Sequence, residues 1–422
     1  MPARKVLSTR TTAAVGAVAL SLALAACEGS GSAKDDPRTV DRVAANRADP
    51  PAEKPSSPSS PSSPSPAQSS ADLSTNVPAS AQDVTVDTPV TLRVANGKLD
   101  NVMVKVQQSS QRLPGAFHDG KTRWTAQELL EPATRYVVIG RATDAAGLPT
   151  KTRVPFRTQD LTLPEQTYAV ITPLQNETVG VGMPVIVNFD VPVTDRAEFE
   201  RHMHVTASPS VRGSWHWMSD QEAHWRPRTY WEPGTRVDVD LDVNGVNAGN
   251  GIYGQMDRAG SFRIGHSVVM KADLKTDKMK VFVNGNKART IPITGGKPGF
   301  ETRSGTKLIV EKFRTKRMDA ATVGIKKKDP EYYNIPRVRY AQRVTFTGEF
   351  LHAAPWSTYA QGSSNVSHGC VGMNVKDAGW LFDRTHRGDP VEVTGTKRGL
   401  EPGNGWTDWD VSFVEYKQGS AL

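Results

Sequence analysis

The chain has 422 residues, enough for two to four domains, and a turn-rich composition with 35 Gly and 29 Pro that is typical of a soluble β protein. Its formal net charge of +8 favours anionic surroundings such as wall polymers or phospholipid headgroups. Two cysteines allow at most one disulfide, so the chain is not a disulfide-built scaffold.

The amino terminus has the pattern of an export signal. Three basic residues within the first ten precede an apolar run from about residue 13 to 26, which is too short for a comfortable membrane span. The run ends in Leu-Ala-Ala-Cys, which resembles a bacterial lipobox and would make Cys27 an acylated mature amino terminus. The alternative is an ordinary cleaved signal peptide with an incidental cysteine. We predict a lipoprotein signal peptide over residues 1–27, a membrane partner through the lipid, and no nucleic-acid partner.

Residues 28–78 are predicted to be a linker. They contain the run PSSPSSPSSPSP, which has no apolar residues to bury and is expected to be extended and disordered. Such a linker would hold the folded part away from the membrane, towards the cell wall.

Two β-rich blocks follow, at 79–160 and 161–266. Each shows short alternating apolar runs, and each carries a related pentapeptide, EPATR from Glu131 and EPGTR from Glu232. These pentapeptides lie about 100 residues apart, the size of one immunoglobulin-like sandwich. We therefore predict two tandem Ig-like β-sandwiches.

Four histidines of the second block invite a metal interpretation: His202, His204, His216 and His224. No cysteine or carboxylate joins them at ligand spacing, so no metal site is predicted. The tryptophans of this block are expected to fill the core of the sandwich rather than a glycan platform.

A third block, 267–396, combines short strands with one main helix predicted over Val375–Arg387. Asn374 is a good N-cap for this helix, with Asp377 in its first turn. Residues 397–422 are too aromatic for a free tail and are expected to pack back onto the body.

The chemistry is predicted to centre on Cys370, in the sequence Ser367-His368-Gly369-Cys370. A thiol attacks as thiolate, and a nearby imidazolium lowers its pKa. Two histidines are available, His368 in the same tetrapeptide and His352 further upstream. Gly369 lets the backbone turn tightly, so that main-chain N–H groups can face a substrate oxygen.

This segment resembles the catalytic signature of the L,D-transpeptidases (the YkuD family), which reads His, a gap, and then Ser/Thr-His-Gly-Cys. Trp356 and Gly362 also fall where actinobacterial members have them. One departure is Gly372, where the family commonly has Asn. The resemblance implies a mainly β chain, with two tandem Ig-like β-sandwiches followed by a YkuD-like β-fold catalytic domain, one main helix and a C-terminal extension.

The resemblance also implies a two-step acyl transfer without a cofactor. Cys370 would attack the amide between the third and fourth residues of a peptidoglycan stem peptide, expel D-Ala and form a thioester. The side-chain amine of diaminopimelate on a second stem would then form a 3→3 cross-link. By resemblance His352 is the base, His368 orients the loop, and the N–H groups of Gly369 and Cys370 hold the oxyanion. Carbapenem β-lactams are the implied inhibitors.

Further residues resemble those lining the family's substrate pocket and lid, with the choice between the two tyrosines left open. These are Met318, Tyr332, Tyr333 and Trp356, to which we add Ser367 and Asn374 as substrate-binding candidates. For Asn374, the N-cap interpretation competes with this role.

Other functions are distinguished by residue order. A papain-like wall hydrolase has Cys before His, whereas both histidines here precede Cys370. A sortase needs a Thr-Leu-x-Thr-Cys sequence, which is absent. A non-enzymatic wall-binding lipoprotein would not need this His and Cys spacing. An L,D-carboxypeptidase would use the same thioester with water as the acceptor, and the sequence leaves that alternative open.

Overall fold

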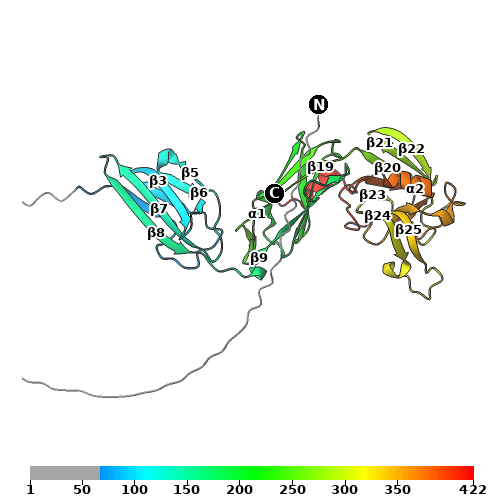
Figure 1. Cartoon of the computed structure of the whole chain (residues 1–422), viewed down its shortest axis with the longest axis horizontal. Coiled ribbons are helices and arrows are strands. Elements are labelled where there is room, and N and C mark those ends of the chain that lie inside the picture. Colours follow the sequence, from blue (N-terminus) through cyan, green and yellow to red (C-terminus); the bar gives the residue numbers. More distant parts are fainter. Residues whose placement is uncertain (1–66) are drawn as a thin grey trace, which may run out of the picture. The chain divides into compact units, whose positions relative to one another are not determined.

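The computed structural model describes residues 67–422, which are built mainly from β-strands (Figure 1). The predicted signal peptide, its Cys27 and most of the predicted linker lie outside the described residues. Within 67–422, no helix is long and apolar enough to cross a membrane.

The first β-sandwich spans residues 72–157 and consists of two four-stranded sheets, ordered β1-β2-β6-β5 and β4-β3-β7-β8. Its strands are β1 (Asp72–Thr75), β2 (Thr91–Ala95), β3 (Gly97–Val106), β4 (Arg112–Leu113), β5 (Gly115–His118), β6 (Arg123–Ala126), β7 (Arg135–Asp144) and β8 (Pro149–Arg157). Buried Leu92 and Trp124 of one sheet join Val104 and Val138 of the other in a single core. This inward-facing alternation is what makes the two sheets pack.

This sandwich starts earlier than the predicted boundary at residue 79. Asp72 of β1 pairs with Ala95 of β2, and the side chains of Ala71 and Val77 are buried. The linker prediction is therefore wrong for residues 71–77, because a short strand there completes a sheet. The strand was missed in the sequence because it is only four residues long and directly follows a Pro/Ser-rich run.

The second β-sandwich spans residues 166–264. Its two main sheets have the orders β10-β12-β15-β14 and β11-β19-β16-β13, and a small sheet has the order β17-β18-β9. The elements are β9 (Gln166–Thr167), β10 (Ala169–Thr172), β11 (Thr178–Val179), β12 (Val185–Phe189), α1 (Arg196–Arg201), β13 (Met203–Ser208), β14 (Gly213–Ser219), β15 (Glu222–Pro227), β16 (Arg236–Leu241), β17 (Asn247–Gly249), β18 (Ile252–Gly254) and β19 (Arg258–Ile264). Trp215, Trp217, Trp225 and Trp231 are all buried, as expected of core residues.

The third β region carries the predicted chemistry. It has a five-stranded sheet, β22-β21-β20-β28-β23, and a four-stranded sheet, β24-β25-β26-β27. Its strands are β20 (Val268–Asp273), β21 (Lys278–Val283), β22 (Asn286–Pro292), β23 (Gly305–Leu308), β24 (Glu311–Asp319), β25 (Asn334–Arg343), β26 (Phe350–Ala353), β27 (Val371–Met373) and β28 (Pro390–Thr394). Met270 and Val391 of the first sheet meet Leu351 and Val371 of the second in one hydrophobic core.

The main helix of this region is α2 (Val375–Phe382), orange in Figure 1. The side chain of Asn374 accepts a hydrogen bond from the N–H of Asp377 at 2.9 Å, so Asn374 is the N-cap. The helix was predicted to reach Arg387 but ends at Phe382. There the ammonium of Lys312 donates a hydrogen bond to the carbonyl of Phe382.

The C-terminal segment packs on the second sandwich, as its aromatic content predicted. It contains the short helix α3 (Phe413–Tyr416). The indole N–H of Trp409 donates to the carbonyl of Gly182 at 2.7 Å. The Arg226 guanidinium lies 4.4 Å from the ring centroids of both Trp409 and Tyr416. The last residues of the chain therefore connect the third region to the second sandwich.

Candidate active site

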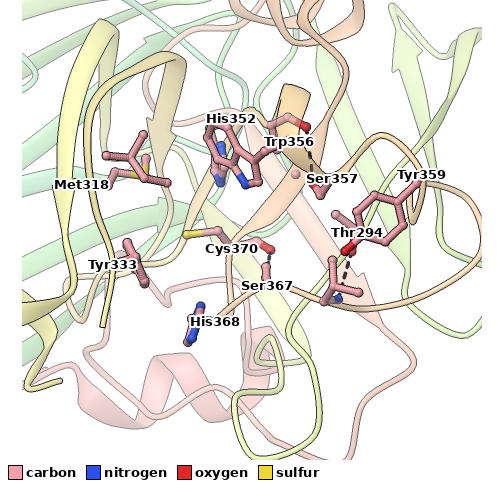
Figure 2. Close-up of a pocket in the computed structure, with 14 residues that line it drawn as sticks. Thr294, Met318, Tyr333, His352, Trp356, Ser357, Tyr359, Ser367, His368 and Cys370 are labelled. Carbon is pink, nitrogen blue, oxygen red and sulfur yellow. Dashed lines mark hydrogen bonds between the residues drawn. The ribbon is translucent and has the colours of Figure 1, made fainter. Parts of the chain in front are cut away.

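One cavity of about 290 Å³ brings together residues from the second sheet of the third region, from the loops between its strands and from the segment that follows β22 (Figure 2). It is lined by Thr294, Met318, Tyr333, Ile335, His352, Ala354, Trp356, Ser357, Tyr359, Val366, Ser367, His368, Cys370 and Gly372. The lining includes Cys370 and both predicted histidines, so the structure places them in one site.

Cys370 is a free thiol immediately before β27. Gly369, which precedes it, has a φ of +116°, a left-handed conformation that side chains rarely adopt. The sulfur lies 3.7 Å from the carbonyl oxygen of Gly348 and accepts a hydrogen bond from the N–H of Phe350. The thiol is thus held between the loop of residues 367–370 and the start of β26.

Burial, more than any charge, controls the protonation of this thiol. It raises the pKa of Cys370 to about 12, with the Glu349 carboxylate adding to the increase and Lys307 opposing it. From the sequence, a positively charged neighbour was expected to lower this pKa. In this structure the sulfur is instead enclosed, so the thiol is protonated at neutral pH.

His352 is buried in β26, which runs parallel to β27 and places His352 opposite Gly372. Its Nδ1 lies 2.9 Å from the carbonyl oxygen of Ala353. Because a carbonyl only accepts, Nδ1 carries the proton, and burial lowers the pKa of the imidazole so that the ring is neutral. Nε2 therefore has a free lone pair, the requirement for a general base.

His368 lies on the other side of Cys370 from His352 in Figure 2. Its Nε2 is 2.7 Å from a carboxylate oxygen of Glu331, which also accepts from the ammonium of Lys297 at 2.5 Å. Its ring packs edge-on against Phe300. These contacts hold His368 between two loops, which fits the orienting role predicted for it.

The hydroxyl of Ser367 makes hydrogen bonds at both ends of the loop of residues 367–370. It donates to the carbonyl of Cys370 at 2.6 Å and accepts from the N–H of Gly369 at 3.1 Å. The Gly369 N–H predicted as an oxyanion donor is thus already engaged. Within residues 67–422, no hydrogen bond occupies the N–H of Cys370, which leaves it as the available donor of the predicted pair.

Of the two tyrosines left open by the sequence, the structure brings Tyr333 and not Tyr332 into the cavity. Met318 lines the same wall as predicted, and the ring of Trp356 stacks on His352 with centroids 5.8 Å apart. Trp356 is still 49% exposed, so it lies at the mouth of the cavity. Asn374 does not line it and acts as a helix cap.

Several lining residues were not predicted, including Thr294, Ile335, Ser357 and Tyr359. They come from three separate segments, since Ser357 and Tyr359 share the loop after β26, and none carries a local pattern that marks it. The pairing of distant strands brings these three segments together.

Two of the four histidines of the second sandwich, His216 and His224, contact the C-terminal segment. Nδ1 of His224 is 2.8 Å from a carboxylate oxygen of Asp408, and Nδ1 of His216 is 2.7 Å from the carbonyl oxygen of Tyr416. Among the described residues, 67–422, no cluster of three or more His, Cys, Asp or Glu side chains is arranged to hold a metal ion.

Comparisons with known proteins agree with this architecture. A family model described as an L,D-transpeptidase catalytic domain matches residues 267–393, and one described as a bacterial Ig domain matches residues 81–247 in a single span across both sandwiches. L,D-transpeptidase 2 of Mycobacterium tuberculosis (strain CDC 1551 / Oshkosh) is 34% identical over 353 residues, which cover 83% of this chain and 85% of that protein. L,D-transpeptidase 5 of Mycobacterium tuberculosis (strain ATCC 25618 / H37Rv) is 33% identical, covering 81% and 75%. A solved structure of LD transpeptidase LdtMt1 in complex with imipenem is 34% identical, with a TM-score of 0.47, and covers 53% of this chain and 97% of that one.

Proposed function

Since the chain belongs to the L,D-transpeptidase family, we propose that it forms 3→3 cross-links in peptidoglycan through a thioester on Cys370. The observation that carries this proposal is the shared cavity of Cys370 and His352, in which Nδ1 of His352 is tied to a carbonyl and Nε2 is left with its lone pair. A buried thiol and a neutral imidazole form a nucleophile and base pair that is uncharged at rest.

In the first step, the sulfur of Cys370 attacks the carbonyl carbon between the third and fourth residues of a donor stem peptide. Nε2 of His352 takes the thiol proton as the C–S bond forms, so that the high pKa of the free thiol is overcome only when substrate is present. The N–H of Cys370 donates to the oxyanion. The imidazolium then protonates the leaving amine, D-Ala departs, and the thioester remains.

In the second step, the side-chain amine of diaminopimelate on an acceptor stem attacks the thioester carbon. Neutral His352 takes a proton from that amine, the C–S bond breaks, and the proton returns to the sulfur. A new amide is formed and the enzyme is regenerated. Attack by water at this point would give the L,D-carboxypeptidase reaction instead, so the two activities are distinguished by their products.

The proposal includes a location. The amino-terminal signal with its lipobox supports export and a lipid on Cys27, which would anchor the protein on the outer face of the cell membrane. Two or more acyl chains give stable membrane anchoring, whereas a single chain does not. In a Cys27→Ala variant, the protein should leave the membrane fraction or accumulate as an uncleaved precursor. Unchanged membrane retention, with an unmodified cysteine in the wild type, would contradict the anchor.

The test of the site is acylation by a carbapenem, followed by intact mass. A relative bound to imipenem supports this class as the probe, and one adduct on Cys370 is expected. His352→Ala should abolish acylation at neutral pH with partial recovery at alkaline pH, since thiolate then forms without a base. His368→Ala should slow acylation with less alkaline recovery, because it disturbs the loop. An adduct that survives Cys370→Ala would show that the nucleophile is misassigned.

A further inference from the structure

A buried cluster of charged side chains lies directly behind Cys370, and the proposed reaction does not use it. Its centre is Glu349, which is 4% exposed. This carboxylate accepts hydrogen bonds from the backbone N–H of Arg303 at 3.1 Å, from the Arg303 guanidinium at 3.0 Å and from the ammonium of Lys307 at 2.5 Å. Lys307 is only 1% exposed. One buried anion is therefore shared between two cations.

The outer edge of the cluster reaches solvent. The Arg303 guanidinium also donates to the carboxylate of Glu401, whose side chain is 53% exposed. The exposed Asp410 is near Lys307, and its carboxylate accepts from the N–H of Thr306 at 2.7 Å. The innermost part, Arg303, Lys307 and Glu349, thus carries one more positive than negative charge.

This cluster is connected to the nucleophile through the backbone on both sides of Glu349. The residue before it, Gly348, has its carbonyl oxygen 3.7 Å from the sulfur of Cys370, and the residue after it, Phe350, donates its N–H to that sulfur. A Cβ placed on Gly369 would lie 3.7 Å from a Glu349 carboxylate oxygen. The Glu349 side chain is therefore beneath the catalytic loop, and its backbone neighbours contact the thiol.

Such an arrangement is costly to bury. Taking two opposite charges out of water is often no better for stability than a well-packed apolar pair, so a buried ion pair by itself is weak evidence of a stabilising role. A charge beside a cysteine, by contrast, changes how easily the sulfur becomes an anion. The location next to the nucleophile gives these side chains a chemical consequence that an apolar pair would lack.

We propose that Lys307 and Glu349 are positioning residues for Cys370. The carboxylate of Glu349, held by Lys307 and Arg303, fixes the Gly348–Phe350 segment against the sulfur. The positive charge of Lys307 favours the thiolate form of Cys370, and the negative charge of Glu349 disfavours it. The proposal rests on the proposed function, because it presupposes that Cys370 is the nucleophile.

The two charges act on the thiol in opposite directions. Lys307 lowers the pKa of Cys370 and Glu349 raises it. The other ionisable groups facing this thiol are His352 and Tyr333, with His368 on the far wall of the cavity. Neither substitution removes any of these groups. If the pair were purely structural, substituting either residue would disturb the fold in the same way. Shifts of the thiol pKa in opposite directions would therefore distinguish an electrostatic role from a structural one.

The test is the rate of Cys370 alkylation by iodoacetamide against pH, followed by intact mass on the folded protein. Lys307→Met should raise the apparent pKa of the thiol and slow alkylation about tenfold at a fixed pH, whereas Glu349→Gln should lower that pKa and accelerate alkylation by a similar factor, one pKa unit being tenfold. The Lys307→Met/Glu349→Gln double variant should lie between them. Shifts in the same direction, or none in either folded variant, would overturn the proposal.

If either single variant does not fold, Glu401→Gln replaces it. Its partly exposed position makes it tolerant of substitution, and loss of its charge leaves Arg303 less neutralised, so alkylation should accelerate by a smaller factor. Unchanged or slower alkylation would contradict the proposal. Alkylation needs no peptide substrate, so these results are independent of whether the wild type forms a thioester with a donor stem.

Discussion

The contact between His224 and Asp408 predicts that attachment of the C-terminal segment to the second sandwich depends on pH. Burial alone would lower the pKa of the imidazole, but the carboxylates of Asp408 and Glu222, 2.8 and 2.7 Å away, raise it from 6.5 to about 9. The hydroxyl of Tyr416 also donates to Asp408 at 3.0 Å, and Arg226 lies over the Tyr416 ring. The charged imidazole is thus part of a closed buried network.

The direction of the pH dependence of stability follows from the raised pKa of His224. A group that binds its proton more tightly when folded stabilises the fold fully below its unfolded pKa of 6.5, and this contribution is lost as pH rises through 9. At about 1.4 kcal/mol per pKa unit, the loss amounts to about 3 kcal/mol. In His224→Gln the charge is absent at every pH, so the variant should be less stable by about that amount at pH 6 and nearly equal to the wild type at pH 10.

The assay is urea unfolding of the protein lacking residues 1–27, followed by tryptophan fluorescence at several pH values. Trp225 and Trp231 lie in the core of the second sandwich and report its unfolding. Comparing the two proteins at each pH removes the contribution of other titrating groups. A difference in unfolding free energy that stays constant from pH 6 to pH 10 would refute the reasoning.

Two further substitutions test the cavity. Gly372→Asn introduces a Cβ 2.9 Å from that of Ala354 and 3.2 Å from a methyl of Thr294. It should therefore destabilise the protein by about 1–3 kcal/mol and slow carbapenem acylation. An unchanged melting temperature with full acylation would contradict this. Glu331→Gln weakens the contacts to His368 and Lys297, so it should raise KM for a donor stem more than it lowers kcat, and a loss confined to kcat would argue against a positioning role.

Local patterns predicted the parts of the site that depend on neighbouring residues. The N-cap at Asn374 needs only its own side chain and the N–H of Asp377, and the structure has that bond. The left-handed φ of Gly369, +116°, likewise follows from a turn within the tetrapeptide. In both cases the chemistry is contained in a few consecutive residues.

Contacts between distant segments were not predictable in this way. Asn96-Gly97 is a residue pair typical of β-hairpin turns, and Asn96 has a φ of +56°, but β2 and β3 belong to different sheets. The turn crosses from one sheet to the other, because β2 pairs with β1 and β6 whereas β3 pairs with β4 and β7. The ion pair of Lys307 and Glu349 is a stronger case, since lysine and glutamate side chains are usually exposed to solvent and nothing in the sequence marks these two as buried.

The central claim, that Cys370 transfers an acyl group between two stem peptides, is tested most directly by mass spectrometry of the products. The protein lacking residues 1–27 is incubated with disaccharide-tetrapeptides whose third residue is diaminopimelate. We expect dimers joined through two third residues, with one D-Ala released per cross-link, and no dimer with Cys370→Ala. Released D-Ala with tripeptide monomers alone would identify an L,D-carboxypeptidase, and dimers formed by Cys370→Ala would show that Cys370 is not the nucleophile.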